Sequence, residues 1–162
     1  MVNKNLCIAS ALFCCTLFSL AGDTEEWRNS GFLDKRIEIV SYLGFTLEEA
    51  FDTFGPPSEV FVYRGEEAWQ DNVVFYFSSH LYLFWFENRV WQIRLDERYE
   101  GEIAGFTMGM PKEAIIGSLG EPFYEDKESC MYVLPDIGVP VRMRLFFQEG
   151  ILVDMYIFRG DF

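Results

Sequence analysis

Several short stretches of this chain are either alternating hydrophobic and polar or continuously apolar, as half-buried and buried β-strands are. They cover residues 60–63, 73–77, 81–86, 90–95, 131–134, 141–147 and 152–158. Short turns separate neighbouring stretches, for example at residues 87–89 and 149–150. The asparagine and glycine in these turns tolerate the positive φ angles of a tight hairpin. The pattern therefore predicts antiparallel β-meanders.

A helical spacing precedes each group of strands. In the first group, apolar residues recur at the spacing of one helix face: Leu47, Ala50, Phe51 and Phe54. Thr46 and Glu49 have the spacing of a capping box, and Gly55 can end the helix. A second helix is predicted over residues 111–119, with Pro111 in its first turn.

The two helical segments are copies of one pattern. Residues 44–57 and 109–122 share the spacing of two glycines, three apolar residues and a final proline, without a gap. The repeat predicts an α+β fold with two tandem repeats, each a short helix followed by an antiparallel β-meander, and with the helices packed on one face of the sheet. The predicted organisation is an N-terminal segment at 22–43, repeat 1 at 44–104 and repeat 2 at 105–162.

Alternation also assigns a core face and an outer face to each meander. The predicted core face carries Leu81, Leu83, Trp85, Trp91, Ile93, Leu95, Met143, Leu145, Phe147, Val153, Met155 and Ile157. The predicted outer face carries Tyr82, Phe84, Gln92, Arg94, Arg144, Phe146, Asp154 and Tyr156. A three-residue hairpin loop would place Tyr82 opposite Arg94 in one copy and Arg144 opposite Tyr156 in the other.

The glycine and proline spacing at 109–122, followed by a three-stranded meander, resembles the SmpA/OmlA (BamE-like) family of small outer-membrane lipoproteins. Its duplication is similar to the tandem helix–sheet repeats of the β-lactamase inhibitor protein, which grips an enzyme with an aromatic-rich surface. The resemblance implies helices on an antiparallel sheet and a protein-binding role in the bacterial cell envelope. It implies no particular partner, because this chain has two copies and lacks a lipobox.

The first 21 residues have the composition of a signal peptide. Lys4 precedes an apolar run at 6–20, and Ser19 and Ala21 are small residues at the −3 and −1 positions of a cut. A retained transmembrane helix is the alternative, but the run is shorter than the ~20 residues that a span needs. We expect cleavage near Ala21 and a periplasmic or secreted chain without a transmembrane helix. Cys130, left after that cleavage, is expected to be a partly buried strand residue.

The net charge and the residue content limit the classes of function that this chain can have. A net charge of −13 disfavours nucleic acid and anionic lipid surfaces, and suits either a basic protein partner or simple solubility. His80, the one histidine, lies in a predicted turn beside Ser78 and Ser79, without the glycines of a nucleophile elbow. Zinc, calcium and phosphate-binding motifs are absent from the sequence. We therefore expect no enzyme activity, no metal and no cofactor.

The expected function is a non-catalytic protein-binding module of the cell envelope, BamE-like or inhibitor-like. Aromatic and arginine residues are enriched at binding hot spots. The candidate contact residues are therefore those of the outer faces: Tyr82, Phe84, Arg94, Arg144, Phe146 and Tyr156. A rival interpretation makes these residues internal core. The alternative function is a carrier or sensor of a small apolar ligand bound between the two repeats.

Overall fold

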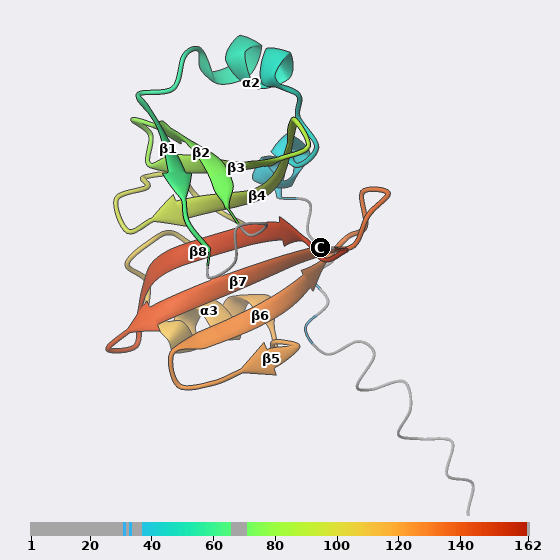
Figure 1. Ribbon diagram of the computed structural model, residues 1–162. Coiled ribbons are helices and arrows are strands. Elements are labelled where there is room, and N and C mark those ends of the chain that lie inside the picture. The colour runs from blue at the N-terminus through green and yellow to red at the C-terminus, as the bar shows by residue number, and fades with distance from the viewer. Residues whose placement is uncertain (1–30, 32, 34–36, 66–70, 162) are drawn as a thin grey trace, which may run out of the picture.

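The computed structural model describes residues 31, 33, 37–65 and 71–161. They form an eight-stranded antiparallel sheet with short helical elements (Figure 1). The strands are β1 (Glu59–Tyr63), β2 (Asn72–Phe77), β3 (Leu81–Phe86), β4 (Arg89–Asp96), β5 (Tyr124–Glu125), β6 (Ser129–Leu134), β7 (Val141–Gln148) and β8 (Ile151–Arg159). The helical elements are the 3₁₀ helix η1 (Glu38–Tyr42) and the α-helices α2 (Leu47–Phe54) and α3 (Lys112–Leu119). The predicted signal peptide and its cleavage site lie outside the described residues.

The sheet joins two meanders through their last strands. Its order is β1-β2-β3-β4-β8-β7-β6-β5, so β4 and β8 are the neighbours that are not consecutive in sequence. At this junction Ile93 lies opposite Ile157, and Leu95 lies opposite Met155. All four side chains are fully buried, so the two meanders share one continuous core. The boundary between repeats at residues 104 and 105 stays a prediction.

The predicted fold class, with helices packed on one face of each repeat, is wrong. An eight-residue helix is about 12 Å long and is too short to cover a sheet of this width. α2 packs only near the β1 edge of the sheet, where its Phe54 contacts Phe77 of β2, and its Leu47 and Phe51 are 41% and 44% exposed. Figure 1 shows it at that end of the sheet. The helices therefore do not form a layer over the sheet.

Irregular segments cover much of the core face instead. Ile39 and Val40 of η1, and Ile103 and Phe106 from the segment between β4 and α3, are buried in the same cluster as the strand residues. Ile115 adds one fully buried side chain from α3. Cys130 lies in a strand, as expected, but it is fully buried rather than partly buried, and burial raises the pKa of its thiol to about 12. This cysteine is therefore unreactive in the folded chain.

A β-bulge in each meander corrects the predicted core face. The register shifts between Phe84 and Trp85 in the β3–β4 pair, and between Phe146 and Phe147 in the β7–β8 pair. A bulge adds one residue to a strand and reverses the alternation beyond it. Val90 and Leu152 are consequently buried, whereas the predicted core residues Trp91 and Val153 are only half-buried.

Local signals at the helix ends give the expected structure. The Thr46 hydroxyl accepts a hydrogen bond from the Glu49 backbone N–H, and the Glu49 carboxylate accepts one from the Thr46 N–H at 2.7 Å. Gly55 and Gly120 end the two α-helices at φ angles of 72° and 88°, where side chains are strained. Among the described residues, no helix is long and apolar enough to cross a membrane.

Candidate protein-binding surfaces

A row of tyrosine and arginine side chains crosses the middle of the outer face. We call it the outer-face ladder: Tyr76, Tyr82, Arg94, Tyr156 and Arg144, which are paired across β2, β3, β4, β8 and β7. The predicted cross-strand pairs of Tyr82 with Arg94 and of Arg144 with Tyr156 are both present. The Arg94 guanidinium lies 5.0 Å from the Tyr82 ring centroid and 5.7 Å from that of Tyr156. One cation is therefore held between two rings.

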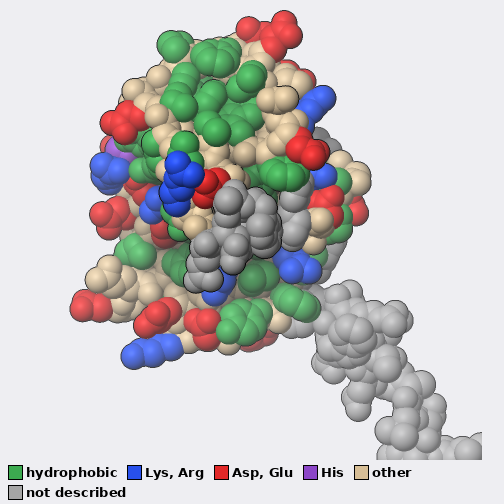
Figure 2. All heavy atoms as spheres, viewed as in Figure 1, with side chains coloured by type: hydrophobic (Ala, Val, Ile, Leu, Met, Phe, Trp, Pro, Cys, Tyr) green, Lys and Arg blue, Asp and Glu red, His purple; other side chains and the backbone are tan. Residues whose placement is uncertain are grey.

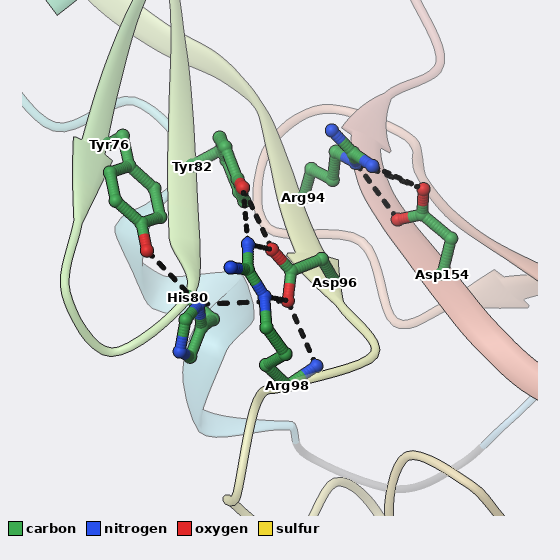
Figure 3. A network of polar contacts seen from close by, with 7 residues as sticks. All are labelled: Tyr76, His80, Tyr82, Arg94, Asp96, Arg98 and Asp154. Carbon is green, nitrogen blue, oxygen red and sulfur yellow. Dashed lines mark hydrogen bonds and ion pairs between the residues drawn. The ribbon is translucent and has the colours of Figure 1, made fainter. Parts of the chain in front are cut away.

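Arg94 is also held by a carboxylate. Its guanidinium donates to both carboxylate oxygens of Asp154, at 2.7 to 3.0 Å (Figure 3). Burial raises the pKa of Asp154, and the hydrogen bonds from Arg94 oppose that rise. The same bonds raise the pKa of Arg94. This two-pronged ion pair crosses the β4–β8 junction and fixes the two meanders to each other on the outer face.

The Asp96 carboxylate lies at the centre of the remaining polar contacts in Figure 3. It accepts hydrogen bonds from the Tyr82 hydroxyl at 2.8 Å and from the Arg98 guanidinium at 2.6 Å. His80 Nδ1 lies 3.7 Å from the Asp96 carboxylate and 3.1 Å from the Tyr76 hydroxyl. Burial of Asp96 opposes ionisation, but the hydrogen bonds from Arg98 and Tyr82 outweigh it and lower its pKa to about 2. Asp96 thus pairs with Tyr82 and Arg98 within the chain.

Asp96 gives the fold a dependence on pH. Because its folded-state pKa of about 2 lies below the ordinary 3.8, its ionised form stabilises the folded state by about 2 kcal/mol. That contribution is present above pH 3.8 and is lost as the pH falls through about 2. We expect the difference in unfolding free energy between the parent and Asp96→Asn to shrink over this range. Urea unfolding at several pH values measures it, and a difference that is constant with pH would contradict the assignment.

The structure brings all six predicted contact residues onto one face but buries them unequally. Phe84 is 5% exposed and packs against Tyr63, with ring centroids 6.0 Å apart. The other five are half-buried. Phe146 lies 4.6 Å from the Arg144 guanidinium, and Arg144 donates to the Ser129 hydroxyl at 3.2 Å. Phe84 therefore has the burial of a core residue, and the binding role of the other five stays a prediction.

Sequence reasoning missed a second surface at the edge of the sheet. All five residues of β1 are exposed, including Val60 at 58%, Val62 at 50% and Tyr63 at 57%. Soluble proteins usually shorten, charge or cover an apolar edge strand, because its free backbone groups can pair with another chain. Residues 60–63 are apolar at every position, so the strand carries apolar side chains on both faces, but such a run is typical of a buried strand and gives no sign of an exposed edge.

The opposite edge of the sheet is covered. β5 pairs with β6 at Tyr124 and Glu125. Farther along β6, the Val133 N–H donates to the Gly31 carbonyl at 2.8 Å, and the Leu33 N–H donates to the Val133 carbonyl at 2.9 Å. Within the part of the chain that the structure describes, no strand pairs with the outer side of β1. Described backbone groups therefore cover the β5–β6 edge of the sheet, whereas no described strand covers the β1 edge.

The apolar surface of β1 continues onto α2. The Phe51 ring of α2 lies 6.1 Å from that of Phe75 on β2, and Phe75 pairs with Val60. Figure 2 shows hydrophobic side chains gathered over α2 and the first strands, in the upper part of the view. We call this surface the β1–α2 patch, made of Leu47, Phe51, Val60, Phe61, Val62 and Tyr63, each at least 39% exposed. Val60 and Val62 lie on the side of the sheet that faces Phe51 of α2, whereas Phe61 and Tyr63 lie on the outer face, so the patch extends over both sides of the edge. Exposed apolar surface of this kind marks interaction sites.

Comparisons with known proteins relate this fold to extracellular proteins. No family model and no curated protein matches the sequence. A cysteine-rich secretory protein from Staphylococcus aureus Mu50 matches 82% of this chain with a TM-score of 0.57 and 11% identity. An extracellular protein containing an SCP domain from Bacillus anthracis Ames matches 76% of it with a TM-score of 0.51 and 12% identity. The chain spans 48% and 46% of those proteins, respectively. At these identities the likeness shows the fold alone.

These neighbours overturn the predicted resemblance to the SmpA/OmlA (BamE-like) family and to the β-lactamase inhibitor protein. The two structures named above are a cysteine-rich secretory protein and an extracellular protein containing an SCP domain. The motif at 44–57 and 109–122 describes a capped helix that ends at a glycine and precedes a proline. Many folds use such helix ends, because the geometry is local. The motif therefore identified the helices correctly and the family wrongly.

Proposed function

We propose that this protein is a secreted, non-catalytic module that binds another protein through the β1–α2 patch. The observation that carries the proposal is the exposure of every residue of β1, at a sheet edge with which no other strand of the described residues pairs. Two exposed apolar side chains of α2, Leu47 and Phe51, widen that edge into a surface. Exposed apolar surface of this extent is costly in water, and a bound partner would remove it from solvent.

Two further observations support the secreted and non-catalytic parts of the proposal. The fold neighbours are described as secretory and extracellular proteins, and residues 1–21 have the composition of a signal peptide. His80 faces Tyr76 and Asp96 within the network, and the sequence lacks a nucleophile motif beside it. These features favour binding over catalysis.

A ligand carrier is less well supported. A small apolar ligand held between the repeats would need space where the two meanders meet. There the core-face residues of β4 and β8 pack directly on one another, and Ile93, Leu95, Met155 and Ile157 are fully buried. The apolar groups at this junction therefore contact each other, which favours the protein-binding proposal.

Site-specific photocrosslinking tests the proposed function. A benzophenone amino acid is placed at Val62 of the secreted chain, in its native host, and the adducts are identified by mass spectrometry. Ile137, which is 47% exposed in the loop after β6, is the matched control for Val62 at 50%. We expect one discrete adduct with a second protein from position 62 and none from position 137. No adduct from position 62, or equal adducts from both, would contradict the proposal.

A further inference from the structure

β1 presents backbone groups as well as side chains. It pairs with β2 at all five residues, from Glu59 opposite Tyr76 to Tyr63 opposite Asn72. Alternate residues of such an edge strand direct their N–H and C=O groups away from the sheet. A partner helix would leave these groups to water, whereas an extended segment would pair with them and continue the sheet. The edge therefore favours an extended partner.

The side chains of β1 define what that segment must carry. Val60 lies opposite Phe75 and shares the core-face side with it, and the Phe75 ring contacts Phe51 of α2. Phe61 and Tyr63 lie on the outer face, where Tyr63 packs against Phe84. Side chains of an added strand alternate between the two faces. Because both faces are apolar at β1, the centre of the segment must be apolar at successive positions.

The charges around β1 select the sign of the partner. Glu48, Glu49 and Asp52 of α2 and Glu59 at the start of β1 are all exposed and acidic. At the other end of β1, Arg64 is already paired with Asp71. The chain as a whole carries a net charge of −13. This field attracts a basic segment and repels a second copy of the same edge.

We infer that β1 accepts an extended basic segment of another protein as a ninth strand, with apolar residues at its centre and Lys or Arg at its ends. The inference rests on the proposed binding role of the β1–α2 patch and adds the binding geometry and the partner's chemistry. Backbone pairing supplies affinity, and the apolar centre and basic ends supply selectivity.

A designed peptide tests the inference without knowledge of the partner. The probe is a fluorescein-labelled octapeptide with a centre of valine, isoleucine, valine and isoleucine between two lysines at each end. We expect saturable binding by fluorescence anisotropy, and slower amide hydrogen exchange in β1 when the peptide is bound. Affinity should fall at least about tenfold when glutamate replaces lysine, and similarly when alternate peptide amides are N-methylated along one edge.

Matched protein variants complete the experiment. Val62→Lys should weaken peptide binding at least about tenfold, because it adds a positive charge and removes an apolar contact at the edge. Ile137→Lys makes the same charge change at a similarly exposed position and should bind like the parent. Melting temperatures of both variants report whether folding is retained.

The other possible results of these binding experiments would each overturn a different part of the inference. Equal binding of the glutamate peptide would overturn the basic partner, and equal binding of the N-methylated peptide would overturn strand addition. No peptide binding, together with a discrete adduct from Val62, would overturn this inference and leave the proposed function standing. A concentration-dependent dimer that Val62→Lys abolishes, seen by analytical ultracentrifugation, would place a second copy on the edge and would also overturn it.

Discussion

Replacement of Arg94 with methionine is expected to lower the unfolding free energy by about 3 kcal/mol. The substitution keeps most of the side-chain volume and removes the guanidinium that holds both oxygens of Asp154. The Asp154 side chain is only 19% exposed, so water can replace few of the hydrogen bonds that Arg94 donated to its carboxylate. The rings of Tyr82 and Tyr156 lose the shared cation as well. Urea unfolding followed by circular dichroism gives the value.

A second substitution separates lost charge pairing from lost packing. Adding Asp154→Asn to Arg94→Met removes the uncompensated carboxylate and should recover most of the stability. pH provides an independent check. Burial raises the pKa of Asp154, and loss of Arg94 removes the hydrogen bonds that oppose that rise. The deficit of the single variant should therefore be largest at neutral pH and should shrink as the carboxyl becomes protonated. If Arg94→Met lowers the unfolding free energy by less than half a kcal/mol at neutral pH, water stabilises the Asp154 carboxylate as well as Arg94 does, and the prediction is wrong.

Truncation of Phe84 to alanine is expected to destabilise the fold by about 3–5 kcal/mol. Phe84 is 5% exposed, pairs with the fully buried Val74 on β2 and packs against Tyr63. Removal of its ring loses the free energy of transferring the ring from water to the protein interior, and it also leaves a cavity, which adds to the cost. Phe146→Ala should cost less than half as much, because Phe146 is half-buried and contacts Arg144 and Tyr156 at the surface of the sheet. Urea unfolding of both variants provides the comparison.

The same two variants test the outer face as a contact surface. If Phe146 contributes to binding, Phe146→Ala should reduce the yield of the Val62 photoadduct while the chain remains folded. A Phe84→Ala variant that keeps its stability would contradict the core assignment of Phe84. An unchanged adduct yield in Phe146→Ala would confine binding to the β1–α2 patch.

Local periodicity predicted the strands because each one is a local feature of this sequence. The seven predicted stretches correspond to β1, β2, β3, β4, β6, β7 and β8, whereas the two-residue β5 gives no periodic signal. The hairpin pairs Tyr82–Arg94 and Arg144–Tyr156 are present, but the predicted three-residue loops are wrong. Phe86 pairs with Arg89 and Gln148 pairs with Ile151, so each loop has two residues, and the bulge in each hairpin supplies the extra residue. The bulges at Trp91 and Val153 did not follow, because alternation assumes an unbroken register.

Long-range features were beyond such reasoning. Alternation assigns faces to β4 and β8 but does not state that these strands pair, since any two strands with apolar core faces could. The position of α2 depends on what else covers the core, and η1 and residues 103–106 cover it together with Ala50 of α2. The exposure of β1 follows from its position at the end of the sheet, which the sequence of the strand does not encode.

The junction of β4 and β8 also bears on how the chain folds. The other strand pairs join neighbours in sequence, and they can form as hairpins by closing short loops. Arg94 and Asp154, which meet across the junction, are 60 residues apart. Closing that loop costs conformational entropy before core contacts compensate it. We therefore expect the two meanders to form early and the β4–β8 junction to pair late. During synthesis, the edge of β4 is then exposed until β8 has been made.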